Sequence, residues 1–479
     1  MKQLIPILIL TAIACGEPVA KVKEKVKDIA EDISAPLGQR DDPATREKER
    51  FDQQWRQLES FRAQQAEAER QRQQQAAAAQ PPANFQLVTG VKETFKGLDA
   101  MAINNAPVNV PITGDVRGPS VLRAQVYLDR IHFAVGAIDG RWGRNSAITV
   151  WWYQRARGLE ATGDIDEQTF RRLAAEAGYA PVVVKYTLTA DDVKGPFRPV
   201  PDSPYEKARR SYLGYESLRE EIAERFHVDQ DFLETLNPEV KFSELNAGAT
   251  INVLNVRPPM PADQPDIAKI VISIAGNSFN GFDTAGNLVF HAPTTLGAGY
   301  DPSPSETLHI VKIFPNPSFH YDPTLYHEVP DTEPDAHLPP GPNTPVGVVW
   351  MALSKEHYGI HGTPDPETIG YASSHGCVRL TNWDATEIEH RVAPGVTVAF
   401  VDRRKKGLPE AFRSAAASCG REGGAKAPHS KGYATASRNI SVENPGDLRL
   451  PRSVSDNDSG STMALATPWI SSSVTASIC

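Results

Sequence analysis

The sequence predicts a multidomain α+β protein in which a mostly β domain follows two small helix-containing modules. The chain has 479 residues, 40% of them hydrophobic, which is enough for about two to four folded units with packed cores. Residues 120–174 predict three helices separated by Gly-containing turns. After residue 266, apolar residues alternate with other residues in the manner of half-buried strands.

The charge and the cysteine count exclude several classes of protein. A formal net charge of −9 gives no general electrostatic attraction to nucleic acid or anionic lipid, so we expect no nucleic-acid partner. Four Cys in 479 residues cannot form a disulfide framework. The 39 Pro residues indicate long loops and linkers between domains.

Residues 1–15 have the layout of a secretory signal, with a charged Lys2, an apolar run and small residues before Cys15. The run is too short to span a bilayer. The segment Ala12-Ile13-Ala14-Cys15 also resembles a bacterial lipobox, which implies a lipid on Cys15 and a membrane-anchored lipoprotein of the periplasm or cell envelope. The alternative is an ordinary cleaved signal with an incidental cysteine.

Residues 16–82 predict a polar helical stalk that ends at Pro81-Pro82. A narrow apolar stripe runs along one helical face. Its members are Phe51, Trp55, Leu58 and Phe61. The stripe either binds a partner or belongs to a solvated stalk, which we favour because the stripe is short.

The helical segment, residues 118–176, resembles the small peptidoglycan-binding domain of exported cell-wall enzymes. The matching positions are Val126, Leu128, Gly136, Asp139, Gly140, Gly143, Thr149, Gln154, Gly158, Leu159, Gly163 and Phe170. Gly140 and Gly163 are expected in turns that need a positive φ. The resemblance implies wall binding; the alternative is that these positions define only a fold.

Residues 212–256 predict a strand, two helices and a strand, and this segment is similar to a LysM domain. The matching positions are Leu218, Ile222, Ala223, Phe226, Val228, Leu233, Leu236, Asn237, Leu245, Gly248 and Ile251. The Gly-Asp-Ser/Thr-Leu turn of that family is replaced here by Tyr215-Glu216-Ser217-Leu218. The module therefore either binds glycan or serves as a spacer.

The β-rich domain is expected over residues 266–402. Ile270, Ile272 and Ile274 alternate as in a half-buried strand, and further strands are expected at 287–290 and 343–350. Within this domain, His361, His375 and Cys377 lie close together in the sequence. An imidazole can take the proton of a thiol or stabilise its thiolate. Spacing alone leaves three alternatives: nucleophilic catalysis, a structural cysteine, or a metal site that also includes His357.

A longer motif around these residues resembles the L,D-transpeptidase (YkuD) catalytic domain. Its segments are Thr344-Pro345-Val346-Gly347, His361-Gly362-Thr363, Pro366, Ile369-Gly370 and Ser373-Ser374-His375-Gly376-Cys377-Val378-Arg379-Leu380. The resemblance implies a β-sandwich-like fold and a cysteine-dependent acyltransferase of peptidoglycan. This mechanism requires no metal and no organic cofactor.

The resemblance also implies roles for individual residues. Cys377 is the expected nucleophile, which forms a thioester with a tetrapeptide stem and releases D-alanine. His361 is the expected proton acceptor and donor, oriented by the carbonyl of Gly362. Gly376 is expected near the oxyanion hole, and His375 either assists the reaction or makes a structural hydrogen bond.

Three further residues, Ser374, Arg379 and Tyr358, are candidate substrate-binding residues. A local backbone bond is the alternative for Ser374, and a structural role is the alternative for Arg379. Residues 297–342 form a Pro- and aromatic-rich insertion that is expected to lie over the substrate groove. Its aromatic residues Phe319, Tyr321 and Tyr326 either contact the stem peptide or pack the insertion down.

Residues 403–479 are rich in Ser, Ala, Gly and Asn and are expected to be disordered, and they contain Cys419 and Cys479. The expected partners are stem peptides, glycan strands and, through the lipid, a membrane. The acyl acceptor is an amine of a second stem, an amine of a lipoprotein, or water, which would make the protein a carboxypeptidase or hydrolase. The alternative outside enzymes is a catalytically silent peptidoglycan-binding protein.

Overall fold

The structure is a computed structural model that describes most of the chain between residues 81 and 401. The described residues are 81–82, 85–261, 264–298, 302–325, 330, 332–401 and the strand 475–477. The signal segment with Cys15, the stalk as far as residue 80, Tyr326, Cys419 and Cys479 lie outside them. Among the described residues, no helix is both long enough and apolar enough to cross a membrane.

Three helices form the predicted helical unit: α5 (Pro119–Arg130), α6 (Arg144–Ala156) and α7 (Glu167–Glu176). The expected turns are present, since Gly140 has φ +68° and Gly163 has φ +83°. Asp166 caps α7 by accepting a hydrogen bond from the Thr169 N–H. Three shorter elements precede α5 or lie beside its start: β1 (Leu87–Val88), α4 (Ala100–Asn105) and β2 (Val108–Asn109).

The second module has the predicted helices, α9 (Leu218–Arg225) and α10 (Gln230–Leu236), and the predicted last strand, β4 (Thr250–Leu254). The prediction of a first strand within 212–217 is wrong. The antiparallel partner of β4 is β3 (Val183–Thr187), whose β-branched residues suit a strand. Residues 212–217 instead lead into the N-cap Ser217, and Leu213 bonds to residues 340 and 343.

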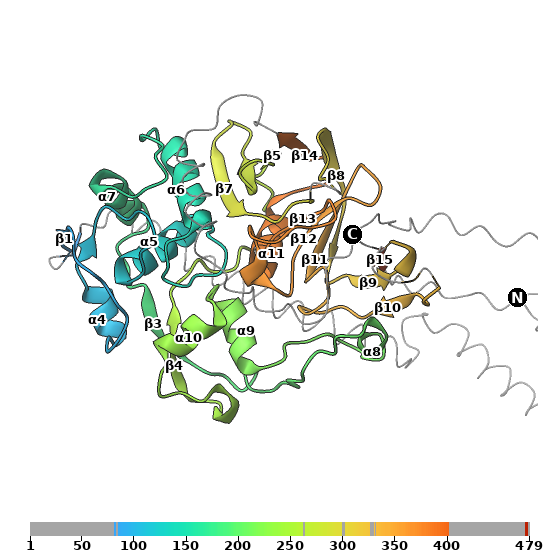
Figure 1. Ribbon diagram of the computed structural model, residues 1–479, viewed down its shortest axis with the longest axis horizontal. Coiled ribbons are helices and arrows are strands. Elements are labelled where there is room, and N and C mark those ends of the chain that lie inside the picture. The colour runs from blue at the N-terminus through green and yellow to red at the C-terminus, as the bar shows by residue number, and fades with distance from the viewer. Residues whose placement is uncertain are drawn as a thin grey trace, which may run out of the picture. The chain divides into compact units, whose positions relative to one another are not determined.

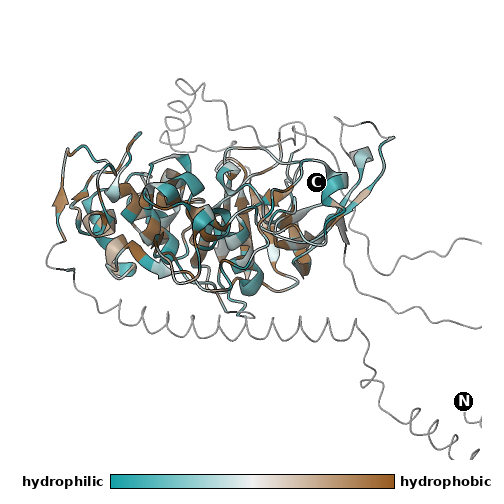
Figure 2. Cartoon of the chain, turned by 90° about the horizontal axis from the view of Figure 1, so that it is seen from below, coloured by the Kyte–Doolittle hydropathy of each residue, from teal (hydrophilic) through white to brown (hydrophobic). Residues whose placement is uncertain are grey.

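The helical unit and the β3-α9-α10-β4 module share one hydrophobic core. Phe95 stacks edge-on against Phe232 of α10, with ring centroids 4.9 Å apart. The same cluster of buried residues includes Leu128 of α5, Phe170 of α7 and Val253 of β4. In Figure 2 the helices carry both hydrophobic and hydrophilic stretches, as expected of elements that bury one side. The two segments are therefore one packed unit.

The carboxyl-terminal domain is built on an eight-stranded sheet in the order β13-β12-β11-β8-β14-β5-β6-β7 (Figure 1). Its strands are β5 (Lys269–Ser273), β6 (Ser278–Phe282), β7 (Leu288–Pro293), β8 (Thr307–Pro315), β11 (Val349–Leu353), β12 (Gly359–His361), β13 (Val378–Arg379) and β14 (Thr397–Val401). Two pairs are parallel, β5 with β14 and β12 with β13. The predicted mostly β domain with helices before it is confirmed.

The strand predictions within this domain are confirmed in part. Ile270 and Ile272 are buried in β5, and Ile274 follows the strand. The predicted strand at 343–350 begins only at Val349, because residues 343–348 form turns in which Gly347 has φ +60°. Helix α11 (Asn382–Arg391) follows β13 and contacts β11 and β12.

A smaller sheet is formed by the insertion, with β9 (Ser318–Tyr321) between β10 (Ala336–Leu338) and β15 (Thr475–Ser477). The prediction of a disordered tail is therefore wrong for residues 475–477, which pair with β9. The short helix α8 (Pro204–Lys207) contacts β10. Three 3₁₀ turns complete the described elements: Phe242–Glu244, Pro323–Leu325 and Pro366–Thr368.

A cluster around one buried arginine joins the helical unit, the β3-α9-α10-β4 module and the carboxyl-terminal domain. Arg257, which is 3% exposed, forms ion pairs with Asp129 of α5 and with Asp384 and Glu387 of α11. Burial alone would raise the pKa of Asp129, yet the Arg257 guanidinium holds it below its usual value. His227, which precedes α10, also bonds to Asp129 at 3.0 Å, so the three units meet at one cluster of charges.

A second connection runs from α6 to the sheet through His291 of β7. The ring of His291 is buried and lies 2.9 Å from Asn280 Oδ1 and 3.1 Å from Thr149 Oγ1 of α6. The backbone N–H of Ala134 donates to the His291 carbonyl at 2.7 Å. The helical unit and the sheet are thus hydrogen-bonded through both backbone and side chains.

Replacing Arg257 by Met should lower the free energy of unfolding by about 3–5 kcal/mol, because three carboxylates would stay buried without their shared cation. Urea titration of the purified chain measures the change. Lys241→Met is the control, since the Lys241–Glu244 pair is exposed and should contribute less than about 0.5 kcal/mol. Equal unfolding midpoints for the two variants would contradict this role of Arg257.

The pH dependence of stability should carry a contribution from His291. Burial lowers its pKa from 6.5 to about 3, so the unfolded chain binds a proton that the folded chain excludes as the pH falls below 6.5. Stability should therefore fall by about 1.4 kcal/mol per pH unit for this group. His291→Gln should remove that part of the slope in urea titrations between pH 4 and about 6.5, and an unchanged slope would refute the assignment.

Candidate active site

The pairing of two short strands brings the predicted histidine and cysteine together. Strands β12 and β13 are parallel neighbours in which Ile360 pairs with Val378 and His361 with Arg379. His361 ends β12, and Cys377 directly precedes β13. Both side chains are 1% exposed. The sheet thus places a buried imidazole and a buried thiol on adjacent strands, although 16 positions separate them in the sequence.

The hydrogen bonds of His361 determine its tautomer. Its Nδ1 lies 2.6 Å from the carbonyl oxygen of Gly362, and a carbonyl can only accept, so Nδ1 carries the proton. The buried Nε2 has no hydrogen-bond partner among the described residues. The ring stacks on Trp350 with centroids 5.4 Å apart. Nε2 is therefore a free acceptor in a fixed ring, which is the state a general base requires.

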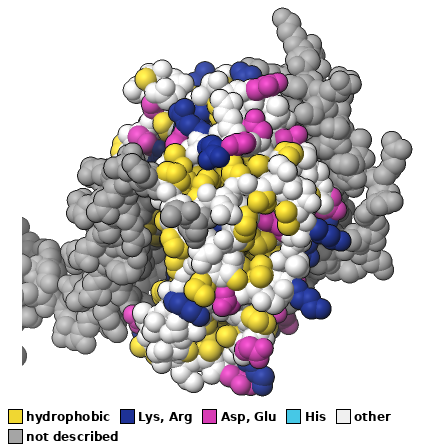
Figure 3. Space-filling view, turned by 90° about the vertical axis from the view of Figure 1, so that its left-hand side faces the viewer, with side chains coloured by type: hydrophobic (Ala, Val, Ile, Leu, Met, Phe, Trp, Pro, Cys, Tyr) yellow, Lys and Arg dark blue, Asp and Glu magenta, His cyan; other side chains and the backbone are white. Residues whose placement is uncertain are grey.

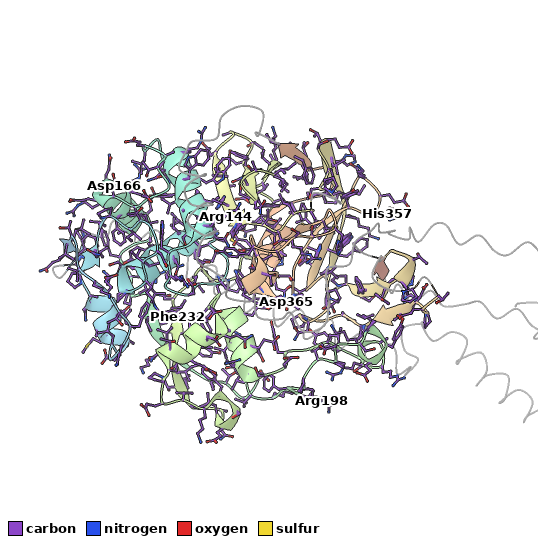
Figure 4. All side chains as sticks on the ribbon, in the orientation of Figure 1. Arg144, Asp166, Arg198, Phe232, His357 and Asp365 are labelled. Carbon is purple, nitrogen blue, oxygen red and sulfur yellow. The ribbon has the colours of Figure 1, made fainter. Side chains whose placement is uncertain are left out.

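Cys377 carries a reduced thiol enclosed by apolar side chains. Its Sγ lies 3.8 Å from the carbonyl oxygen of His357, a residue in the β11–β12 loop with φ +70° (Figure 4). Burial lowers the pKa of the His357 ring to about 4, which leaves that ring neutral at physiological pH. The contact that His357 makes with the Cys377 thiol at 3.8 Å is made by its backbone carbonyl.

The turn before Cys377 is closed by the side chain of Ser374. The Ser374 hydroxyl donates to the Cys377 carbonyl at 2.6 Å and accepts the Gly376 N–H at 3.3 Å. Ser374 is 1% exposed and makes the local backbone bonds that were the alternative for it; its contact with substrate stays a prediction. The Gly376 N–H was expected to face an oxyanion. Here it donates within the turn, to Ser374 Oγ at 3.3 Å.

The turn before Cys377 requires glycine at position 376. Its φ is +108°, and an added Cβ would lie 2.7 Å from the ring of Tyr358. Its carbonyl accepts a hydrogen bond from the Ser303 hydroxyl at 2.9 Å. Tyr358 therefore lies against the turn that carries the cysteine, and Lys355 Nζ lies 4.9 Å from the centroid of its ring.

The other predicted residues lie around this turn. His375 is 9% exposed. Arg379 is half-buried, and its backbone pairs with that of Thr295. Its Nε has no hydrogen-bond partner within the described ranges, and its charge opposes the rise in the pKa of Asp365 that burial causes. The charges of Arg379 and Asp365 therefore interact beside the site.

The acidic loop that follows β12 was not predicted from the sequence. Asp365 lies at the centre of Figure 4, and Glu367 follows it in the same loop. Burial raises the pKa of Glu367 to about 7. Burial also lowers the pKa of Lys207, a buried residue of α8 that interacts with Asp365. The two acidic positions were visible in the motif region, but the interaction of Asp365 with Lys207 joins residues 158 positions apart in the chain.

The insertion packs onto the site through its aromatic residues. Phe319 is 3% and Tyr321 is 6% exposed, and both belong to the cluster of buried residues that contains Trp350 and Cys377. Of the two interpretations of these rings, packing is therefore the one observed. Leu213, from the segment before α9, completes the same cluster.

A metal site gains no support from the geometry. Within the part of the chain that the structure describes, no group of three or more His, Cys, Asp or Glu side chains could hold a metal ion. A buried imidazole on β12 and a buried thiol directly before β13 are the two groups that nucleophilic acyl transfer uses, and no hydrogen bond joins His361 Nε2 to a described residue.

Two family models match the chain. Residues 268–401 match the "L,D-transpeptidase catalytic domain", and residues 117–173 match the "Putative peptidoglycan binding domain". The first match contains the eight-stranded sheet with His361 and Cys377, and the second contains α5, α6 and most of α7. Neither of these two matches covers the β3-α9-α10-β4 module, so its LysM-like interpretation stays a prediction.

Similar proteins carry related names. The chain is 29% identical over 181 residues to "Putative L,D-transpeptidase YkuD" of Bacillus licheniformis, covering 38% of this chain and 92% of that protein. It is 49% identical over 59 residues to the Bacillus subtilis protein of the same name, covering 12% and 36%. "Probable L,D-transpeptidase YbiS" of Escherichia coli is 39% identical over 75 residues, covering 16% and 24%. The chain thus spans a minor part of the last two.

Solved structures with low similarity include two L,D-transpeptidases. That of Xylanimonas cellulosilytica is 16% identical with a TM-score of 0.28, covering 62% of this chain and 98% of that one. L,D-transpeptidase 3 from Mycobacterium tuberculosis is 16% identical with a TM-score of 0.24, covering 33% and 76%.

Gly376→Ala should slow the reaction of Cys377 with iodoacetamide by about tenfold or more, because the new methyl group would displace the turn from Tyr358. Mass spectrometry of the Cys377 peptide gives the rate. Gly286→Ala is the matched control, with φ +82° but nothing within 4 Å of an added Cβ. A similar loss of rate in both variants would show that close packing at Gly376 is unimportant.

Proposed function

We propose that the protein is a cysteine-dependent enzyme that remodels peptidoglycan cross-links, because residues 268–401 match the L,D-transpeptidase (YkuD) catalytic domain and residues 117–173 match a peptidoglycan-binding domain. The observation that supports this most is the tautomer of His361. Its Nδ1–H bond to Gly362 leaves Nε2 as a proton acceptor, with the Cys377 thiol on the neighbouring strand. The catalytic machinery proposed is therefore Cys377, His361 and the Gly362 carbonyl.

In the first step, Cys377 Sγ attacks the carbonyl carbon of the third residue, a diamino acid, of a tetrapeptide stem. His361 Nε2 takes the thiol proton and then gives it to the amine of the departing D-alanine. A thioester on Cys377 remains. In the second step, an acceptor amine attacks the thioester, Nε2 takes a proton from that amine, and the proton returns to the sulfur as the thiol leaves.

The negative charge that develops on the carbonyl oxygen needs hydrogen-bond donors in the cysteine turn. The backbone N–H groups of Cys377 and Gly376 are the proposed donors. The Gly376 N–H is held by Ser374 Oγ at 3.3 Å, a long bond that the oxyanion can replace. Arg379, Tyr358 and His375 are proposed to contact or orient the stem peptide.

Contact with the wall is proposed through the amino-terminal unit. A groove there is lined by Lys92, Lys96 and Arg117 together with Leu236 and Pro238. On this side of the molecule, hydrophobic side chains lie among charged ones (Figure 3). Glu93 and Asp99 also line the groove, so it combines charges of both signs with apolar groups, as suits a wall polymer whose peptides carry charged and apolar groups. We propose an envelope location, with export and lipidation directed by residues 1–15 and Cys15.

The acceptor is the part of the proposal that the site leaves open. A second stem would give a cross-link between two diamino acids, and a lipoprotein amine would tether a membrane to the wall. Water would make the protein a carboxypeptidase. A catalytically silent wall-binding protein is the second candidate, and the Nδ1–H tautomer of His361 together with the reduced thiol of Cys377 next to the neighbouring strand argues against it.

The purified chain incubated with disaccharide tetrapeptides should yield cross-linked dimers with loss of D-alanine, detected by mass spectrometry. Cys377→Ala should lower the rate by at least about 10³-fold, because no thioester can form. Cys419→Ala is the matched control and should retain the rate.

The products distinguish the alternatives. Tripeptides without dimers would identify water as the acceptor. Stem binding without any product, together with no covalent labelling of Cys377 by a carbapenem, would refute the enzyme and leave the wall-binding protein.

A further inference from the structure

The side chain of Asn382 lies against Gly362, the residue whose carbonyl orients His361. Asn382 is 1% exposed and begins α11. An added Cβ at either Gly347 or Gly362 would overlap its amide oxygen, so Asn382 lies against the α-carbons of both glycines. The same oxygen accepts the Val348 N–H at 3.2 Å. The position of the Gly362 peptide, and hence of the acceptor for His361 Nδ1, depends on this amide.

The amide of Asn382 is itself held by a carboxylate from outside the catalytic domain. Asn382 Nδ2 donates to Glu224 Oε2 at 3.1 Å and to the Pro342 carbonyl at 3.2 Å. Glu224 belongs to α9, which contacts α11. Its other oxygen accepts the Tyr215 hydroxyl at 2.9 Å. Burial raises the pKa of Glu224 to about 7, which indicates how far this carboxylate is removed from water.

The same module holds the loop that leads to Gly347. Asn343 Nδ2 donates to Glu220 Oε1 at 2.7 Å and to the Gly214 carbonyl at 3.0 Å. The Leu213 N–H donates to the Pro340 carbonyl at 2.9 Å, and the Leu213 carbonyl accepts the Asn343 N–H at 3.0 Å. These contacts hold α9 and the segment before it against the loop that leads to Gly347, on one side of the Gly362 peptide. From α9, Glu224 contacts Asn382.

We propose that Glu224 is a positioning residue for His361 and acts through Asn382. Glu224 fixes the Asn382 amide, the amide fixes the Gly362 peptide, and the Gly362 carbonyl fixes the His361 ring with Nε2 as the acceptor. The β3-α9-α10-β4 module is thus a part of the active site as well as a neighbour of it. The inference rests on the proposed role of His361 as the base for Cys377, but not on the identity of the substrate.

The experiment measures the rate at which iodoacetamide alkylates Cys377 in the full chain, read on the Cys377 peptide by mass spectrometry. Glu224→Ala should slow alkylation by about tenfold or more and move the rate towards that of His361→Ala, because a displaced base loses most of its effect. Glu224→Gln keeps an oxygen for the Asn382 amide and should stay within about threefold of the unaltered chain. Glu234→Ala, on α10 of the same module, removes a pair with Arg219 and should leave the rate unchanged.

A double-mutant cycle tests the proposed route. If Glu224 acts through Asn382, the double variant with both residues changed to Ala should be no slower than Asn382→Ala alone. If the rate losses of the two single variants multiply in the double variant, Glu224 does not act through Asn382. Unchanged alkylation in Glu224→Ala with a lowered melting temperature would show a purely structural role and overturn the proposal.

If Glu224→Ala does not fold, Glu224→Asp replaces it. The shorter carboxylate cannot reach the amide at the same distance, so a rate equal to that of the unaltered chain would refute the proposal. Alkylation requires no peptidoglycan. A chain that shows the predicted alkylation pattern but forms no product from stem peptides would refute the proposed function and leave the positioning role intact.

Discussion

The buried cluster around Arg257 is the constraint on which the other parts of the structure depend. One guanidinium holds carboxylates from α5 and α11, and His227 of the second module bonds to one of them. His227 also stacks on Trp383 of α11, with ring centroids 5.1 Å apart. Buried charges are stable only when all are paired. The cluster therefore tolerates one arrangement of the three units. That arrangement also fixes the position of α11 and of Asn382, the first residue of this helix.

The candidate active site is a consequence of backbone geometry near α11. Parallel pairing of β12 and β13 brings His361 beside the cysteine turn. Gly376 permits the turn to lie against Tyr358, and Ser374 closes it. The Gly362 carbonyl then selects the tautomer of His361. Each of these steps uses backbone or a glycine, so the two reactive side chains need few side-chain partners of their own.

The amino-terminal unit has two relations to the catalytic domain. Through His291 and Arg257 it contributes to stability, since both residues bond across the boundary between the units. Through Glu224 and Leu213 the amino-terminal unit also contacts residues at the candidate site. A module that is similar to a LysM domain in sequence is thereby hydrogen-bonded to Asn382 and to the loop that leads to Gly347.

The sequence by itself determined the helices of the amino-terminal unit, the alternation of β5 and the reactive pair, because helical pattern, strand alternation and a long motif are local properties of the chain. It also identified Gly362 as the orienter, on the basis of a family resemblance. Only the tertiary structure decided that β3 rather than residues 212–217 pairs with β4, that Ser374 closes the turn, and that Glu224 reaches Asn382. Strand partners and buried polar contacts depend on which distant segments share a core, and Glu224 and Asn382 lie 158 positions apart.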